Sequence, residues 1–247
     1  MKIFFWLRSA VMTLLIPLWV ILFGLSSILF HALLNSRKVD NFHIETWARL
    51  NLWSFGIRVK VVGLENIPDE GCLFLFSHSS FFDIFAIAGY LTDLRFGAKA
   101  ELFKIPIFSQ SMRAMGTIPI ARQNRNEVYK VYEEAKSRFK NKEKFALSPE
   151  GGRFYGPHLS SFKAGPFMFA MSAEVPVVPL VILGAYQCLP KGEVVANKDR
   201  FGREIELHIL KPFSTVGYRQ ENRSELQAKV YAAMDPVWSE YYARSEA

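Results

Sequence analysis

The chain has 247 residues, of which 50% are hydrophobic and 22 are phenylalanine, and it carries a net charge of +7. This length allows one sizeable domain with an appendage, and the apolar content is high for a cytosolic enzyme, so contact with lipid is expected. The two cysteines have neither the number nor the spacing of a disulfide framework or a zinc site. A small secreted scaffold is therefore excluded, and a reducing, cytosol-facing compartment is indicated.

The first predicted element is an apolar segment over residues 9–34 that contains no Asp, Glu, Lys or Arg. At about 1.5 Å per residue, one helix of this length crosses a ~30 Å hydrocarbon layer. Pro17 and Gly24 interrupt the segment, and a proline kinks or divides a helix, so two shorter helices half-embedded in one leaflet fit equally well. Basic residues flank both ends and leave the orientation open. We expect residues 1–38 to be an N-terminal membrane anchor and residues 39–247 to be the main domain.

The main domain shows alternating helical and strand patterns. Residues 41–55 have apolar side chains at helical intervals, which predicts an amphipathic helix packed on the core. Residues 223–242 predict a closing helix that bends near Pro236. Short apolar runs between them predict strands, and the alternation indicates an α/β fold with a mixed central sheet flanked by helices. The predicted strands are 58–62, 72–76, 94–98, 117–120, 145–147, 177–183 and 204–210.

A histidine and an aspartate follow the apolar run 72–76 at a spacing of five residues. On one regular helix His78 and Asp83 would lie about 140° apart, so one of them must be outside it. Ser80 and Asp83 have the spacing of a capping box, so we expect Ser79 or Ser80 at the N-cap, Asp83 in the first turn and His78 in the turn before it. Asp83 could then fold back onto the imidazole.

A carboxylate that accepts a hydrogen bond from one ring nitrogen leaves the other nitrogen as a proton acceptor, as a general base for an alcohol requires. A His–Asp pair is about as often a structural cap or core pair, so both interpretations stay open. Ser77 and Ser79 raise a rival hypothesis, a serine nucleophile. Such a nucleophile usually occupies a Gly-x-Ser-x-Gly elbow, which the chain lacks.

Three later segments have residues suited to binding. Arg122 ends the strand-like segment 116–122, which contains the strand predicted at 117–120, and its paired donors there could hold a phosphate. The sequence Ser148-Pro149-Glu150-Gly151-Gly152-Arg153 places an acceptor, two permissive backbone positions and a guanidinium in one loop. Residues 175–180 form a buried strand, which by itself indicates core.

Eight basic residues crowd the stretch from Arg122 to Lys144. A solvated helix face and an attraction to anionic headgroups or to the phosphates of a carrier are about equally favoured. Nucleic acid is a poor third partner because no binding motif is present and the basic residues accompany an apolar anchor.

In this order, the four segments resemble the motif blocks of the glycerolipid acyltransferase family, specifically the 1-acyl-sn-glycerol-3-phosphate acyltransferases. The resemblance covers residues 77–183, and residues 162–165 are similar to the family's segment after the third block. Ser77 replaces the usual Asn, Pro119 and Ala121 depart from the second block, and Gly152 replaces the usual Thr or Ser.

The resemblance implies that residues 39–247 are an acyltransferase catalytic domain. In it, His78 would deprotonate the free hydroxyl of lysophosphatidic acid, which attacks the thioester of acyl-CoA or acyl-carrier protein to give phosphatidic acid. Asp83 would orient His78, and neither a metal nor a cofactor beyond the acyl donor is implied. An oxyanion donor is also needed, and backbone N–H groups at the start of the helix after His78 would suit it.

The resemblance also implies partners and a location. The residues expected to bind the glycerol phosphate are Arg122, Glu150, Gly151 and Arg153, with Lys99 and Lys163 as weaker candidates, for which a solvated surface charge is the simpler explanation. A membrane association with the catalytic domain facing the cytoplasm follows, at the inner membrane if the source is bacterial.

Other functions remain open from the sequence. The same reaction could use another acceptor, such as a lyso-ornithine lipid, lysophosphatidylcholine or glycerol 3-phosphate. A noncatalytic membrane lipid-binding protein would bind lipid without releasing CoA, and a serine hydrolase would release free fatty acid without an acceptor.

Overall fold

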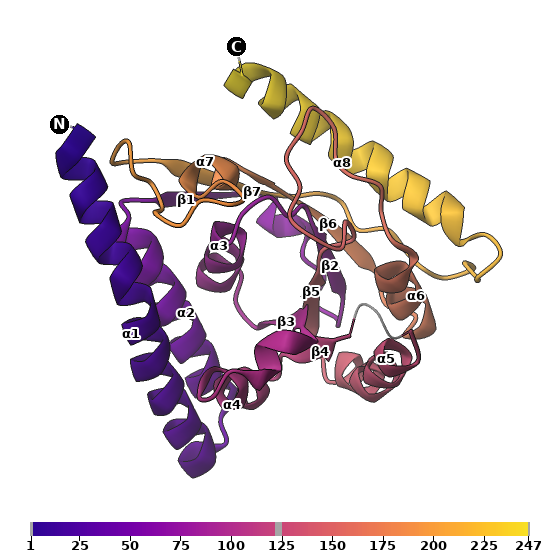
Figure 1. Cartoon of the computed structure of the whole chain (residues 1–247). Coiled ribbons are helices and arrows are strands. Elements are labelled where there is room, and N and C mark those ends of the chain that lie inside the picture. The colour runs from indigo at the N-terminus through magenta and orange to yellow at the C-terminus, as the bar shows by residue number, and fades with distance from the viewer. Residues whose placement is uncertain (1, 122–124, 247) are drawn as a thin grey trace.

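A computed structural model describes residues 2–121 and 125–246 (Figure 1). Each of the seven predicted strands is present to within one residue at either end, which confirms the α/β prediction. The strands are β1 Arg58–Val62, β2 Leu73–Phe76, β3 Leu94–Lys99, β4 Ile118–Ile120, β5 Lys144–Leu147, β6 Val177–Leu183 and β7 Glu204–Ile209. The helices are α1 Lys2–Leu34, α2 Arg37–Ser54, α3 Phe82–Tyr90, α4 Phe108–Ala114, α5 Arg125–Lys140, α6 Ala164–Ser172, α7 Ala185–Cys188 and α8 Arg223–Glu246, with short 3-10 turns η1 Leu64–Asn66 and η2 Ala100–Lys104.

Within the described chain, the strands form one seven-stranded sheet in the order β1-β7-β6-β2-β5-β3-β4. The neighbours β6, β2, β5, β3 and β4 are mutually parallel, whereas β7 pairs with β6 in the antiparallel sense and with β1 in parallel. The sheet is therefore mixed, as predicted. Its five parallel strands end at one common edge, where ligand sites of α/β proteins form.

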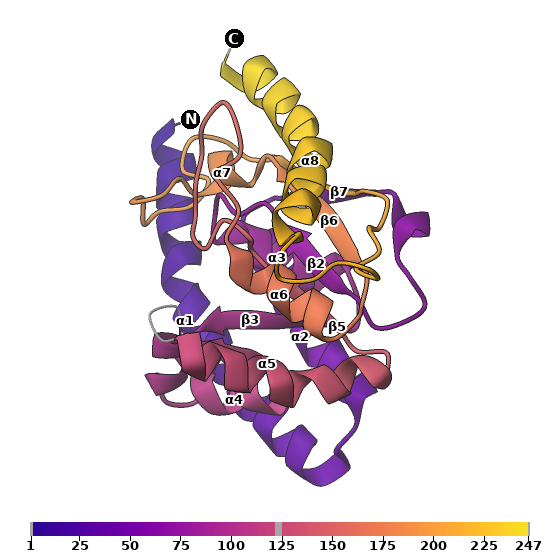
Figure 2. The same cartoon turned by 90° about the vertical axis from the view of Figure 1, so that its right-hand side faces the viewer.

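Two hydrophobic cores lie on the two faces of the sheet, because side chains of a strand alternate between faces. In β2, Phe74 and Phe76 point into the core that contains α2 and α3 residues, while Leu73 and Leu75 point into the core with α5, α6 and α8. Figure 2 shows α5, α6 and α8 together on the face turned toward the viewer. Since β2 is buried on both faces, its sequence is a continuous apolar run.

The N-terminal apolar segment is one helix, α1, which continues through Pro17. A division of this segment at Pro17 into two helices, one of the two expected arrangements, does not occur. The second helix is α2, which begins at Arg37, four residues before the predicted helix, and packs beside α1 after the turn at Asn35 and Ser36 (Figure 1). By length and composition, α1 from Ile3 to Leu34 is the described helix that could cross a membrane.

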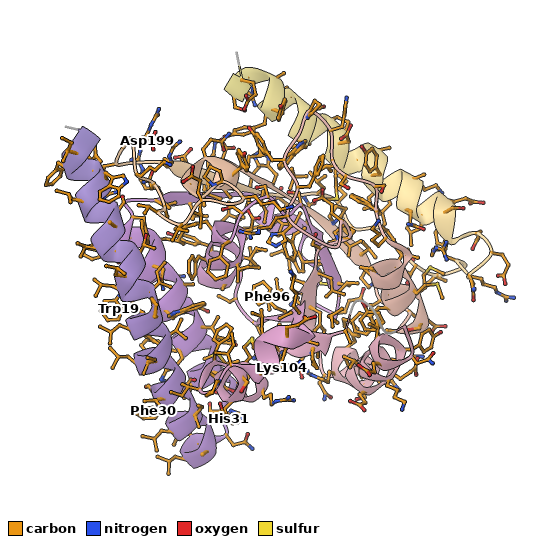
Figure 3. All side chains as sticks on the ribbon, viewed as in Figure 1. Trp19, Phe30, His31, Phe96, Lys104 and Asp199 are labelled. Atoms are coloured by element: carbon orange, nitrogen blue, oxygen red, sulfur yellow. The ribbon has the colours of Figure 1, made fainter. Side chains whose placement is uncertain are left out.

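Polar contacts join α1 to the rest of the protein along its length. Ser9 Oγ donates to the carbonyl of Asn197 at 2.8 Å, Ser27 Oγ lies 2.9 Å from Ser111 Oγ in α4, and His31 Nδ1 lies 3.0 Å from Asp40 Oδ2 in α2. Figure 3 shows Asp199 beside the first turns of α1 and His31 near its far end. These contacts support a helix that proline alone would weaken by removing one backbone hydrogen bond.

Candidate active site

The predicted site residues gather where the parallel strands end. His78 follows β2, Glu150 and Arg153 follow β5, and Lys99 is the last residue of β3. Arg122, expected in the same site after β4, lies outside the described residues. Because β2, β5 and β3 are adjacent parallel strands, their following segments share one edge of the sheet.

The imidazole of His78 contacts Asp83 as expected. Nδ1 of His78 lies 2.9 Å from Asp83 Oδ2, which also accepts the amides of Ser79 and Ser80 at 2.8 Å each. A carboxylate oxygen only accepts, so Nδ1 carries a proton, and in the neutral ring the lone pair is on Nε2. The Asp83 side chain is fully buried and that of His78 is 17% exposed. No described residue forms a hydrogen bond with Nε2, so the imidazole is held through Nδ1 and its other nitrogen has no partner among the described residues.

The start of α3 lies within one residue of the capping-box prediction. The residue before the helix is Phe81, without a side-chain cap, and the helix begins at Phe82. Ser80 Oγ donates to the carbonyl of Leu189 at 2.9 Å and accepts the amide of Phe82 at 3.3 Å. Because Phe81 itself has helical dihedral angles (φ −67°, ψ −26°), the bond from the Phe82 amide to Ser80 Oγ and the bond from the Ser80 amide to Asp83 Oδ2 match the predicted capping box around Ser80, one residue before the assigned cap. Asp83 does lie in the first turn, and His78 lies outside the helix.

Hydrogen bonds within this turn also use its backbone donors. The amides of Ser79, Ser80 and Phe82 all have acceptors inside the protein. These three amides are therefore not aimed at a substrate oxygen, and the expectation that the start of this helix supplies the oxyanion donors stays a prediction for its other amides.

The serines around His78 are buried. Ser77 is 1% exposed, and its Oγ accepts the amide of Ile182 at 2.8 Å. Ser79 is 2% exposed. A nucleophile must reach a substrate carbonyl, so this burial disfavours the serine-hydrolase hypothesis.

Glu150 lies behind His78 and contacts protein backbone with both oxygens. Oε1 accepts the amide of His78 at 2.9 Å and Oε2 accepts the amide of Ser160 at 3.0 Å. The residue is 7% exposed. Burial raises the pKa of Glu150 to about 7, although the two amide hydrogen bonds act to lower it and the charge of Asp83 raises it further. Both carboxylate oxygens thus accept backbone amides of the protein, one of them from His78, and the expected contact of Glu150 with substrate stays a prediction.

The segment from β5 to α6, residues 148–163, is here called the Glu150 loop. The amide of Phe154 donates to the carbonyl of His78 at 2.8 Å, so Arg153 directly precedes a residue bonded to the base. Arg153 is half-buried, and no described residue hydrogen-bonds or pairs with its guanidinium. Gly151 has a φ of +75°, which favours glycine, and a Cβ there would lie 3.4 Å from Lys163 Cγ. Lys163 is exposed, and its ammonium, like the guanidinium of Arg153, has no hydrogen-bond or ion-pair partner among the described residues.

Lys99 and Arg138, two of the basic residues named from the sequence, differ in their contacts with the rest of the protein. Lys99 is exposed at the end of β3. Within the basic stretch of α5, Arg138 is committed to the protein, since it bonds Glu143 at 2.6 Å and donates to the carbonyl of Gly116 at 2.9 Å.

The sequence did not reveal the backbone amides of Ser79, Ser80 and Ser160 that fix Asp83 and Glu150, because every residue except proline carries such a donor.

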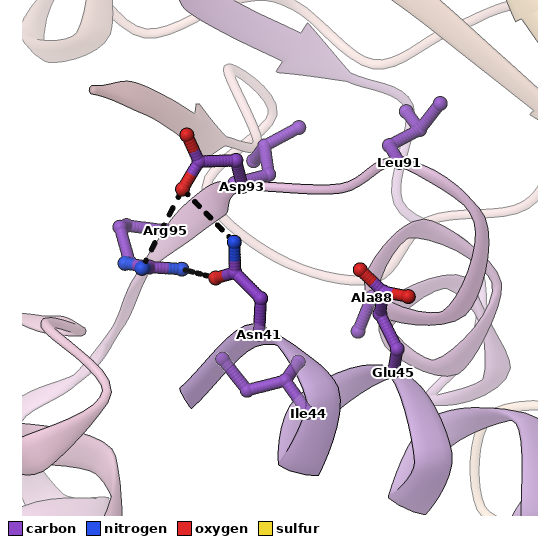
Figure 4. A pocket seen from close by; sticks show the side chains of 8 residues that line it. Asn41, Ile44, Glu45, Ala88, Leu91, Asp93 and Arg95 are labelled. Carbon is purple, nitrogen blue, oxygen red and sulfur yellow. Dashed lines mark hydrogen bonds and ion pairs between the residues drawn. The ribbon is translucent and has the colours of Figure 1, made fainter. Parts of the chain in front are cut away.

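A separate small hollow lies at the opposite edge of the sheet, where β3 begins (Figure 4). Arg95, which is 4% exposed, donates to Asn41 Oδ1 at 2.8 Å, and Asn41 Nδ2 donates to Asp93 Oδ1 at 3.2 Å. Arg37 also pairs with Asp93. These polar groups satisfy one another and join the start of α2 to β3, so the hollow has the features of a structural junction.

Comparison with known proteins shows which family the chain belongs to. The profile of the Acyltransferase family matches residues 58–183, which include the His78–Asp83 pair and the Glu150 loop. The chain therefore belongs to the Acyltransferase family.

Individual relatives carry more specific names. The chain is 28% identical over 183 residues to the chloroplastic 1-acyl-sn-glycerol-3-phosphate acyltransferase BAT2 of Brassica napus, covering 69% of this chain and 53% of that protein. It is 27% identical over 179 residues to the 1-acyl-sn-glycerol-3-phosphate acyltransferase of Pseudomonas aeruginosa, covering 70% of each. The chain spans about half the length of the plant and algal relatives it matches.

A solved structure is similar over the whole chain. The crystal structure of the 1-acyl-sn-glycerophosphate (LPA) acyltransferase PlsC from Thermotoga maritima has a TM-score of 0.80 and 28% sequence identity. The alignment covers 100% of this chain and 98% of that one, so it includes α1 and α2 as well as the sheet.

Proposed function

We propose that the protein transfers an acyl group from acyl-CoA or acyl-carrier protein to the free hydroxyl of lysophosphatidic acid and forms phosphatidic acid. The observation that carries the proposal is the 2.9 Å contact of His78 Nδ1 with a buried Asp83, which leaves Nε2 available as a base. The relatives from Brassica napus, Pseudomonas aeruginosa and Thermotoga maritima are named as acyltransferases of 1-acyl-sn-glycerol 3-phosphate, which supports this choice of acceptor.

In the proposed reaction, His78 Nε2 takes the proton of the acceptor hydroxyl as its oxygen attacks the thioester carbonyl carbon. The carbon–sulfur bond then breaks, and the imidazolium returns the proton to the departing thiolate. The products are phosphatidic acid and the free thiol of the carrier. Asp83 balances the charge on the imidazolium, and neither a covalent enzyme intermediate nor a metal takes part.

The acceptor phosphate is proposed to bind the uncommitted guanidinium of Arg153, since arginine donors match phosphate oxygens in pairs. Lys163, next to Gly151, and Lys99, at the end of the neighbouring strand, are additional candidates for the same phosphate. Arg122 is proposed for this site on its position in the sequence alone.

For location, we propose that α1 lies half-embedded in one leaflet, with residues 1–38 as the anchor and 39–247 as the catalytic domain. A spanning helix would meet lipid on every side, but α1 has polar contacts with the domain near both ends. Its other face exposes apolar side chains at helical intervals, which suits the acyl layer. These include Ile3, Leu7, Val11, Leu14, Leu18, Leu25, Leu29 and Leu33. A cytoplasmic catalytic domain, at the inner membrane of a bacterial source, completes the proposal.

An acceptor panel with purified protein in detergent tests the function. Lysophosphatidic acid, lysophosphatidylcholine, a lyso-ornithine lipid and glycerol 3-phosphate are each supplied with one acyl-CoA, and thiol release and lipid product are measured. Fastest turnover of lysophosphatidic acid is expected. Preference for another acceptor would overturn the assigned substrate, and lipid binding without thiol release would indicate a noncatalytic lipid-binding protein.

A further inference from the structure

The Glu150 loop has no helix or strand of its own between β5 and α6. A long irregular segment holds one conformation only where other elements bind its backbone groups, because its own hydrogen bonds are few. Its beginning is held by His78, through the amide of Phe154 and the carboxylate of Glu150. The later part must be fixed by another element.

That element is α8. Trp238 Nε1 donates to the carbonyl of Gly156 at 2.9 Å, the Tyr231 hydroxyl donates to the carbonyl of Leu159 at 2.9 Å, and Gln227 Nε2 donates to the carbonyl of Phe162 at 3.2 Å. Steps of four and seven residues place these side chains on one face of the helix. Figures 1 and 2 both show the loop running beside α8.

Asp235 lies on the same face of α8, and both of its carboxylate oxygens contact the Glu150 loop. Oδ1 accepts the amide of Leu159 at 2.8 Å, and Oδ2 lies 2.8 Å from Nδ1 of His158. The Asp235 side chain is 15% exposed and that of His158 is 67% exposed. The bond to Leu159 is thus the sheltered one and the pair with His158 is at the surface.

The amide bonded to Asp235 is one residue from the site. Ser160, which follows Leu159, donates its amide to Glu150 Oε2, and Oε1 of Glu150 accepts the amide of His78. A continuous path of hydrogen bonds and two peptide units therefore runs from α8 to the backbone of the base. Arg153 lies in the stretch of loop between these two attachments.

We propose that α8 fixes the conformation of the Glu150 loop and that Asp235 is a positioning residue for Arg153. The role rests on the proposed function, in which Arg153 binds the acceptor phosphate. Asp235 acts through the Leu159 amide and does not touch substrate. The arrangement assigns α8 a role in acceptor affinity, although it lies outside the segment matched by the family profile.

The test compares Asp235→Ala, Asp235→Asn and Glu240→Ala in the full chain in detergent. Glu240 lies on the same helix, and its side chain is 73% exposed in a 4.0 Å pair with Arg244, so Glu240→Ala is the matched control. Amide hydrogen exchange of residues 155–163 is measured beside kcat and KM for lysophosphatidic acid. Asp235→Ala should speed local exchange and raise the acceptor KM by roughly tenfold each, because a charged hydrogen bond to a backbone amide is lost.

The two measurements separate this role from general stability. The kcat of Asp235→Ala should stay within about threefold, since both bonds to His78 remain. Asp235→Asn should recover most of the KM and of the protection, because an amide oxygen can still accept from Leu159. Unchanged loop exchange, exchange that rises equally over the whole chain, or an Asp235→Asn no better than Asp235→Ala would each overturn the proposal.

The outcomes also separate this proposal from the proposed function. If the wild-type protein transfers no acyl group to lysophosphatidic acid, the acceptor assignment fails. Local exchange then still decides whether α8 and Asp235 fix the loop.

Discussion

Two histidine–aspartate pairs in this protein have nearly the same contact distance and lie in different surroundings. His78 Nδ1 is 2.9 Å from Asp83 Oδ2, and His31 Nδ1 is 3.0 Å from Asp40 Oδ2. Asp83 is also fixed by two backbone amides at the edge where the parallel strands end, whereas Asp40 joins α2 to α1. Contact distance alone therefore does not identify a base. The support of the carboxylate and the neighbouring cationic loop distinguish the two pairs.

The largest expected effect tests this comparison by removing the histidine of each pair. His78→Ala should lower kcat by ~10²–10⁴, because a general base contributes that factor. His31→Ala removes a contact that joins α1 to α2 away from the edge of the sheet where His78 lies, and it should leave kcat nearly unchanged. Initial rates of thiol release are measured for both variants, with circular dichroism to confirm folding. Similar losses in the two variants would contradict the assignment of the base.

A second prediction concerns Glu150, whose carboxylate accepts the backbone amide of His78. The pKa of Glu150 is raised to about 7 by burial. Between pH 4.5 and 7 the folded protein holds a proton that the unfolded chain has released, so the free energy of unfolding falls as pH rises through this window and levels off above it. The total change is about 3 kcal/mol from this group. Glu150→Gln should lack that part of the pH dependence.

Chemical unfolding of the wild type and of Glu150→Gln from pH 4.5 to 8 checks this. The glutamine variant starts less stable, because its NH₂ group faces a backbone amide that needs an acceptor. The informative quantity is the difference between the two curves, which should change with pH. Parallel curves would show that Glu150 does not titrate in this range.

Residue-level comparison shows which features the sequence could predict. The strands were predictable because β2 and β6 are buried on both faces and read as unbroken apolar runs. The contact between His78 and Asp83 was also predictable, since a spacing of five residues required a turn before the helix. Both follow from local chain geometry and from burial.

Other features depend on partners that are remote in sequence. The hydroxyl of Ser80 also donates to the carbonyl of Leu189, a contact that the local capping-box pattern does not encode. Glu150 turns toward the amides of His78 and Ser160, a direction that its own loop sequence does not encode. The helix through Pro17 likewise depends on α2, α4 and residues 190–203. Tertiary contacts decided each case against or beyond the local preference.

A third prediction tests the cation on the Glu150 loop. Arg153→Ala should raise the acceptor KM about 10- to 100-fold, because charge-assisted hydrogen bonds to phosphate are worth about 1.5–3 kcal/mol. Arg219→Ala removes an exposed arginine outside the site and serves as the charge-matched control. Steady-state kinetics with varied lysophosphatidic acid measure both. An unchanged KM and kcat in Arg153→Ala would remove this residue from the acceptor site.

The smallest expected effects are those of substitutions at Gly151 and Gly152, two neighbouring glycines that the sequence alone does not distinguish. Gly151 has a φ of +75°, so Gly151→Ala should destabilise the protein by about 1–2 kcal/mol through backbone strain. At Gly152 the φ is outside that region and an added Cβ would meet nothing within 4 Å, so Gly152→Ala should stabilise by about 0.4–1 kcal/mol by restricting the unfolded chain. Unfolding free energies of the two variants should therefore move in opposite directions. Equal shifts would mean that the turn beside Arg153 does not require the left-handed conformation at Gly151.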